Sequence, residues 1–288
     1  MAGLPLLIVT PHSAGYVPQD VLWDMIGEKS RDPGARQQHL DYLFGQGDPF
    51  TDVIFHHPAA FHLYASVSRF VVDLNRERST GGRNGVVKLT DFDATPLYPS
   101  HIALTPADIE ERLVQFWDPF HEAAEGMISR HKIELLLVGH AMSAQGPEVG
   151  PDTGRARPAL CLMTGGDGQG NATGEGVPTV SPQAARKLRE SAERHFALLI
   201  ASAPDVPNRV ALNDPWSADE VSVRYSSPAR PNRIAAFGLE INRNLYLNDV
   251  DAQINPLPGR LTALQQACAG FASEALEIVR NYPLGGDA

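Results

Sequence analysis

Residues 133–140 read IELLLVGH, an apolar run that ends in a glycine and a histidine. An apolar run of this length is typical of a strand that is buried on both faces of a parallel sheet. Polar residues directly after such strands lie at the edge of the sheet where α/β proteins bind their ligands. The stretch therefore predicts an α/β fold, and it predicts that His140 lies at a ligand site.

The same kind of pattern recurs along the chain. Further buried strands are predicted at residues 4–9, 70–74, 159–163, 209–212 and 234–241. Helical spacing is found at residues 105–128, with an expected kink at Pro119, and at residues 182–201 and 261–280. The polar segments 27–47 and 204–231 are interpreted as excursions beside the site. Alternating strands and helices predict one domain over residues 1–288, with helices on both faces of its sheet.

Composition narrows the class of protein. The 288 residues carry a net charge of −10 and are 43% hydrophobic, which is enough apolar surface for a folded core. The negative charge argues against nucleic acid and anionic membranes as partners. There is no apolar run of about 18 residues and no signal-peptide pattern at the start, so we expect a soluble, cytoplasmic protein. Cys161 and Cys268 lie in apolar stretches and are expected to be buried thiols.

Several residues that follow the apolar runs could carry chemistry. His12 and His140, with carboxylates nearby, could form a catalytic zinc site with three protein ligands and one open position, or each could be a structural histidine. Asn75 and Arg76 could grip a substrate carboxylate, or Arg76 could be paired within the protein. Glu240 lies in an apolar run, where a carboxylate is costly unless it is paired or close to a metal.

Six ordered motifs over almost the whole chain resemble those of the N-formylglutamate amidohydrolase family. They are PHS at 11–13, SRxxxDxNR at 68–76, DPFH at 118–121, GHAM at 139–142, NDP at 213–215 and EINRxLY at 240–246. The second and the last are the specific ones. The resemblance implies kinship with zinc-dependent exopeptidases of the carboxypeptidase type. It also implies a three-layer α/β/α fold around a mixed, mostly parallel sheet.

The resemblance further implies a metal site. His12 and His140 match the two metal histidines, and Asp48 falls where the family has a carboxylate, with Asp52 as the reserve candidate. One zinc ion is the implied cofactor.

The resemblance also implies roles for the remaining site residues. Glu240 matches the general acid/base, and Arg69 is suited to a second substrate contact or to the developing oxyanion. Four residues are expected to bind substrate or line the site: Asn75, Arg76, Arg243 of the last motif, and His121 of the DPFH motif. Arg112, on the same helical pattern as His121, is a further candidate for the lining.

Three departures from the family pattern stand out. Val138 replaces the family's aspartate two residues before the second histidine, and Ala141 replaces the serine after it. Because residues of this kind orient metal-bound imidazoles, we expect weaker metal binding or a changed geometry. A Gly-Gly segment after the NDP motif is replaced by Trp216-Ser-Ala-Asp-Glu220, which leaves the exact substrate open.

These features predict a zinc-dependent amidohydrolase that cleaves a small N-acyl amino acid. N-formyl-L-glutamate, giving L-glutamate and formate, is the simplest substrate, and histidine degradation is the pathway that the resemblance suggests. One alternative is a zinc exopeptidase or deacylase for another carboxylate-bearing amide. Another is a catalytically silent binding protein of the same fold. The sequence sets no oligomeric state.

Overall fold

The computed structural model describes residues 3–174, 177–248 and 254–285. Its centre is a six-stranded sheet in the order β2-β1-β3-β6-β4-β5. Only the pair β4–β6 is antiparallel, so the sheet is mixed and mostly parallel, as predicted. The strands are β1 (Leu6–Thr10), β2 (Phe61–Tyr64), β3 (Leu135–Met142), β4 (Leu160–Met163), β5 (Val210–Leu212) and β6 (Ala235–Asn242).

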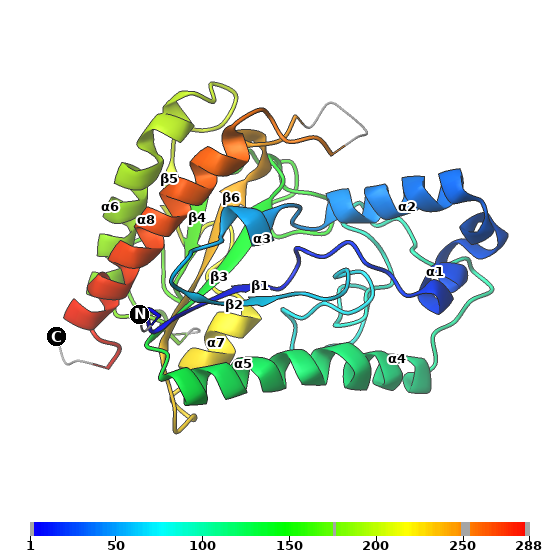
Figure 1. Ribbon diagram of the computed structural model, residues 1–288, viewed down its shortest axis with the longest axis horizontal. Coiled ribbons are helices and arrows are strands. Elements are labelled where there is room, and N and C mark those ends of the chain that lie inside the picture. Colours follow the sequence, from blue (N-terminus) through cyan, green and yellow to red (C-terminus); the bar gives the residue numbers. More distant parts are fainter. Residues whose placement is uncertain (1–2, 175–176, 249–253, 286–288) are drawn as a thin grey trace.

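Helices cover both faces of this sheet (Figure 1). On one face, α3 (Thr51–Ile54), α6 (Pro182–Ala201) and α8 (Arg260–Asn281) bury their apolar residues against one side of the strands. The other face is covered by α5 (Asp118–His131) and α7 (Glu220–Ser226). The expected three-layer α/β/α architecture is confirmed.

Six further helical elements complete the described fold. They are α1 (Gln19–Ile26), the 3₁₀ turn η1 (Gly27–Arg31), α2 (Pro33–Gln46), α4 (Pro106–Arg112), the π turn η2 (Leu113–Trp117) and the 3₁₀ turn η3 (Arg243–Leu245). No helix in the described ranges is long and apolar enough to cross a membrane.

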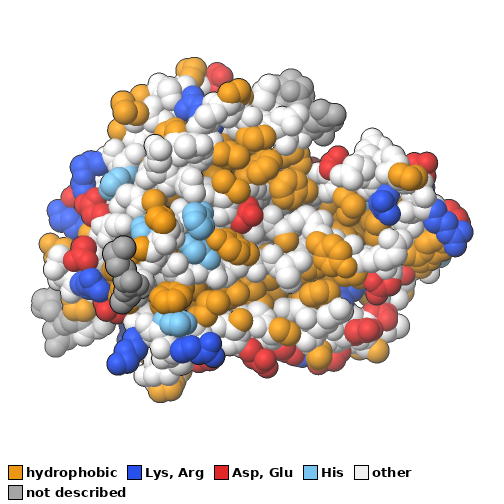
Figure 2. All heavy atoms as spheres, viewed as in Figure 1, with side chains coloured by type: hydrophobic (Ala, Val, Ile, Leu, Met, Phe, Trp, Pro, Cys, Tyr) orange, Lys and Arg blue, Asp and Glu red, His pale blue; other side chains and the backbone are white. Residues whose placement is uncertain are grey.

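Figure 2 shows hydrophobic side chains across the middle of one face of the molecule, with charges of both signs towards its margins.

Five of the six predicted strands are confirmed, and one is wrong. Residues 70–74 form turns, because the N–H groups of Val71 and Val72 bond to the carbonyl of Ser68 instead of to a neighbouring strand. Their apolar side chains still enter the core, so burial produced a strand-like pattern without a strand. Conversely, β2 was missed because it is a short, partly exposed edge strand.

The helix predictions fare similarly. The predicted helices at residues 182–201 and 261–280 are α6 and α8, and the helical pattern at residues 105–128 corresponds to α4, the π turn η2 and α5. Pro119 lies in the first turn of α5, and a kink there stays a prediction. The polar segments 27–47 and 204–231 are not wholly irregular, because they contain α2 and α7. Both begin with an aspartate cap, Asp32 and Asp219, which satisfies a free backbone N–H group. Cys161 and Cys268 are buried and free.

Candidate metal and catalytic site

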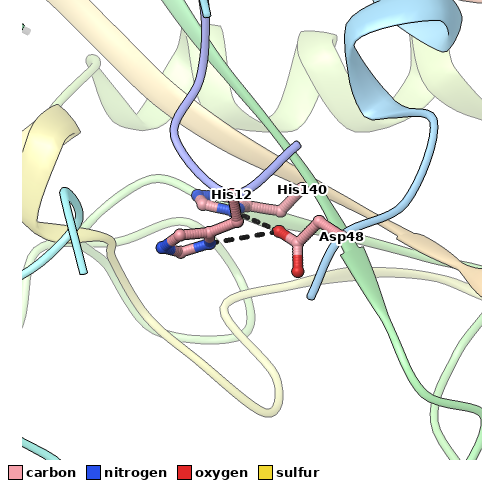
Figure 3. Close-up of side chains that lie close together, drawn as sticks. All are labelled: His12, Asp48 and His140. Carbon is pink, nitrogen blue, oxygen red and sulfur yellow. Dashed lines mark hydrogen bonds and ion pairs between the residues drawn. The ribbon is translucent and has the colours of Figure 1, made fainter. Parts of the chain in front are cut away.

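Three buried side chains meet where β1 and β3 point towards the same end of the sheet. His12 follows β1, His140 lies within β3, and Asp48 comes from the turn between α2 and α3. The Nδ1 atoms of His12 and His140 lie 3.2 and 3.0 Å from Oδ2 of Asp48 (Figure 3). One ligand atom from each residue lies within 4.8 Å of the other two. The structure thus brings together the three residues predicted to bind metal.

The backbone fixes Asp48 beside His12. The Asp48 N–H donates to the carbonyl oxygen of His12 at 3.2 Å, which ties the two loops together. A Cβ on Gly47 would lie 3.2 Å from that same carbonyl oxygen, so a small residue suits this approach. Thr51 caps the turn by donating its hydroxyl to the Asp48 carbonyl at 2.8 Å.

The second nitrogen of His12 is held by a carboxylate. Asp73 Oδ1 lies 2.7 Å from His12 Nε2, and Asp73 Oδ2 pairs with Arg69 at 3.1 Å and Lys88 at 2.9 Å. Although burial alone would raise the pKa of Asp73, the charge of Lys88 holds that pKa well below its usual range. A carboxylate of this kind fixes the orientation of a metal-binding imidazole.

His140 is held differently. Its Nε2 lies 3.3 Å from Asn75 Nδ2, and Asn75 Oδ1 accepts the N–H of Val221 in the first turn of α7 at 3.0 Å. Val138, at the position of the family's aspartate, is fully buried in the apolar core. Burial alone would lower the pKa of His140, but its hydrogen bond to Asp48 and the charge of Glu240 raise it to about 9. The group that contacts Nε2 of His140 is therefore an amide, whereas the group that contacts Nε2 of His12 is a carboxylate.

Glu240, the predicted general acid/base, lies beside the metal cluster on the strand next to His140. It is the register partner of His140 across the parallel pair β3–β6. Its Oε2 atom is buried and has no hydrogen-bond partner among the described residues. Burial raises the pKa of Glu240 to about 7, which suits a group that must both accept and return a proton near neutral pH.

A cavity of about 470 Å³ opens over these groups. Its lining includes the metal cluster and five further predicted site residues: Arg69, Asn75, Arg76, Glu240 and Arg243.

Two arginines of this lining differ in how far they are engaged. Arg76 donates one bond to the Asn75 carbonyl at 3.0 Å, and its guanidinium group makes no other hydrogen bond or ion pair with the described residues. Arg69 bridges Asp48 and Asp73. Arg76 is therefore the freer cation for an anionic ligand.

The structure does not bring His121 or Arg112 to this cavity. His121 is buried between Tyr225 and the carbonyl of Leu74, at 3.2 and 3.1 Å, and burial lowers its pKa to about 3. Arg112 is buried and donates to the hydroxyl of Tyr98 at 2.7 Å. Both residues lie outside the cavity lining.

Asp52, the reserve ligand, lies in α3 and is absent from the metal cluster found among the described residues. Of the two candidate carboxylates, the geometry favours Asp48.

Other site residues were not singled out from the sequence. They are Lys88, which is buried beneath the site, and Arg157, which forms one wall of the cavity. The Arg157 guanidinium carbon lies 4.4 Å from the ring centroid of Trp216, which belongs to the segment noted above as a departure from the family pattern. The one available signal was Lys88 itself, a lysine within the otherwise apolar residues 86–89. Nothing local in the sequence marks Arg157, because its partner Asp152 lies in an irregular loop.

Comparison with known proteins agrees with the motifs. The family model for N-formylglutamate amidohydrolase matches residues 4–247. No curated protein matches the sequence.

Two solved structures share the fold, and a third is a weaker match. The N-formylglutamate amidohydrolase from Ralstonia eutropha JMP134 is 22% identical with a TM-score of 0.66, over 98% of this chain and 96% of that one. The gene product Atu2144 from Agrobacterium tumefaciens is 17% identical with a TM-score of 0.57, over 97% and 93%. A metallo-carboxypeptidase from Burkholderia cenocepacia is 10% identical with a TM-score of 0.37, over 94% and 56%.

Proposed function

Because the chain belongs to the N-formylglutamate amidohydrolase family, we propose that it hydrolyses the amide bond of a small N-acyl amino acid with the help of one zinc ion. N-formyl-L-glutamate is the first substrate to test, and its products would be L-glutamate and formate. The observation that carries the proposal is the buried group of His12, Asp48 and His140 beside a carboxylate, Glu240, whose Oε2 has no partner among the described residues.

The donor set fits zinc. Two imidazole nitrogens and one carboxylate oxygen are ligands that catalytic zinc sites use, and three protein ligands leave one position open. The three residues converge on one point from separate segments, and the site opens into the cavity. When bound there, zinc supplies Lewis-acid polarisation of a carbonyl oxygen and acidifies water.

Glu240 moves the proton. Its carboxylate accepts a proton from the attacking water as the new C–O bond forms at the acyl carbon. It then returns that proton to the leaving amine nitrogen as the C–N bond breaks. The pKa of about 7 suits both steps, because neither protonation state of Glu240 is strongly disfavoured near neutral pH.

The arginines of the cavity orient the substrate. Arg76 offers a planar guanidinium group that can bind a carboxylate through two hydrogen bonds. Arg243 lines the same cavity and donates one bond to the carbonyl of Gly45. Arg69, tied to Asp48 and Asp73, is positioned to stabilise negative charge that develops beside the metal.

A second candidate substrate class rests on one wall of the cavity. Trp216 and Met163 present apolar surface there, and Arg157 is already neutralised by Asp152 at 2.8 Å. This wall favours an amide that carries a carboxylate and a larger apolar group.

The experiment is a hydrolysis assay with a panel of N-acyl amino acids. The purified protein is incubated with N-formyl-L-glutamate, N-acetyl-L-glutamate and N-acyl derivatives of apolar amino acids, and the released amine is measured. Activity that is lost on chelation and restored by zinc supports the proposal. If the zinc-loaded protein releases amine from none of these compounds, the proposal is contradicted.

A further inference from the structure

A lysine lies buried under the metal cluster. Lys88 is 1% exposed, although it comes from a loop between β2 and α4. Its ammonium nitrogen lies 2.9 Å from Asp73 Oδ2 and 2.6 Å from Asn84 Oδ1. Burying an ammonium group is costly, and a surface position would remove that cost. The position therefore needs a reason beyond the stability of the loop.

The hydrogen bonds of Asp73 divide its two oxygens between two tasks. Oδ1 lies 2.7 Å from His12 Nε2 and also accepts the N–H of Asn75 at 3.0 Å. Oδ2 receives the two cations, Arg69 at 3.1 Å and Lys88 at 2.9 Å. With Oδ2 held in this way, the carboxylate cannot rotate without breaking two ion pairs, so Oδ1 remains on the His12 ring.

The backbone ties Lys88 to the same point. The Asp73 N–H donates to the carbonyl of Val86 at 2.7 Å, which fixes the loop that carries Lys88 against the turn that carries Asp73. Arg69 cannot replace Lys88, because its other guanidinium nitrogen binds Asp48 at 3.2 Å. Of the two cations paired with Asp73, Lys88 is thus the one that makes no ion pair with Asp48, a proposed metal ligand.

We propose that Lys88 is a positioning residue for the metal site: it locks Asp73, and Asp73 holds the His12 imidazole with Nδ1 directed at the metal. The proposal rests on the zinc site proposed above. A simple electrostatic role for Lys88 makes the opposite prediction, because removing a cation close to the site would strengthen the binding of a divalent ion.

The test is the zinc affinity of Lys88→Met, measured by competition with a chromophoric chelator. Partners that orient metal-binding histidines typically change affinity by about 10–100-fold, so we expect zinc to bind at least tenfold more weakly. Cobalt(II) in place of zinc should show a changed visible spectrum, because the His12 ring is no longer fixed. Lys187→Met, at an exposed ion pair with Glu190 on α6, is the matched control and should bind zinc like the wild type. Unchanged or tighter zinc binding by folded Lys88→Met overturns the proposal.

A double-mutant cycle covers the case in which Lys88→Met does not fold. The double variant Asp73→Asn/Lys88→Met has no carboxylate at position 73 that could be left unpaired when Lys88 is removed. Its zinc affinity is compared with that of Asp73→Asn alone. If Lys88 acts through Asp73, both variants bind zinc with the same affinity. A further tenfold loss in the double variant overturns the proposal. If the wild type itself binds no zinc, the proposed zinc-dependent function is contradicted. If the wild type binds zinc and the Lys88 variants behave otherwise than expected, only the positioning role of Lys88 is contradicted.

Discussion

His140 and Glu240 are register partners on the neighbouring parallel strands β3 and β6. Register partners project from the same face of a sheet, and both side chains line the same cavity. The backbone hydrogen-bond ladder, rather than a side-chain contact, sets their spacing. Substitution of either residue should therefore change the chemistry of the site without moving the other.

Removing both histidines should remove the metal. The variant His12→Ala/His140→Ala keeps only Asp48 of the three ligands, so zinc content by mass spectrometry should fall from about one ion per chain to near zero. His101→Ala, at an exposed position, is the control and should retain zinc. Zinc content equal to wild type in the folded double variant would place the metal elsewhere.

Replacing Glu240 with glutamine should stop turnover and leave zinc bound. Glutamine keeps the shape of the side chain but cannot accept the proton, so kcat should fall by about 10²–10⁴-fold. Metal content and kcat are measured on the same sample, with Glu28→Gln at an exposed ion pair as the control. A kcat within about threefold of wild type, with zinc bound, would defeat the catalytic role, since that difference is less than ~1 kcal/mol in the barrier.

Arg76→Lys should weaken substrate binding. An ammonium group cannot reproduce the two parallel hydrogen bonds of a guanidinium group, so KM should rise by about tenfold or more with a smaller change in kcat. The carboxamide analogue of the substrate should be hydrolysed poorly by both proteins. The control is Arg78→Lys, because Arg78 pairs with Asp118 and Glu110 outside the cavity. If the KM of Arg76→Lys equals that of the wild type, Arg76 does not bind the substrate carboxylate as proposed.

His121 should make the protein sensitive to acid. Burial lowers its pKa to about 3, below the value of about 6.5 expected in the unfolded chain. Between these two values the unfolded state binds the proton more readily, so the stability contribution is complete above pH 6.5 and is lost as the pH falls towards 3. The expected slope is at most about 1.4 kcal/mol per pH unit.

The measurement is urea unfolding of wild type and His121→Gln between pH 7 and pH 4. The free-energy difference between them should shrink as the pH falls, because only the wild type must exclude a proton at this position. His101→Gln, exposed to solvent, should follow the wild-type curve. A difference that is independent of pH would contradict the assignment.

The sequence predicted the layers of this fold because its central strands are continuous apolar runs. It also marked His12 and His140, which follow or lie within two of those runs. The error at residues 70–74 has the same origin, since burial alone makes a turn look like a strand. Lys88 and Val221 were not predicted as parts of the site. Their roles depend on which loop packs under which strand, and periodicity carries no information about that packing.

The place of β6 in the sheet bears on how the chain assembles. β6 is the last described strand in sequence, yet in space it lies between β3 and β4. While the protein is being synthesised, a nascent chain that ends before Ala235 can form β2-β1-β3 and β4-β5 but has no strand to join them. Both β3 and β4 then present open hydrogen-bonding edges, which favour non-native pairing with other chains. Arrival of β6 closes both edges in one step and brings Glu240 beside His140, so the sheet and the proposed site are completed by the same strand.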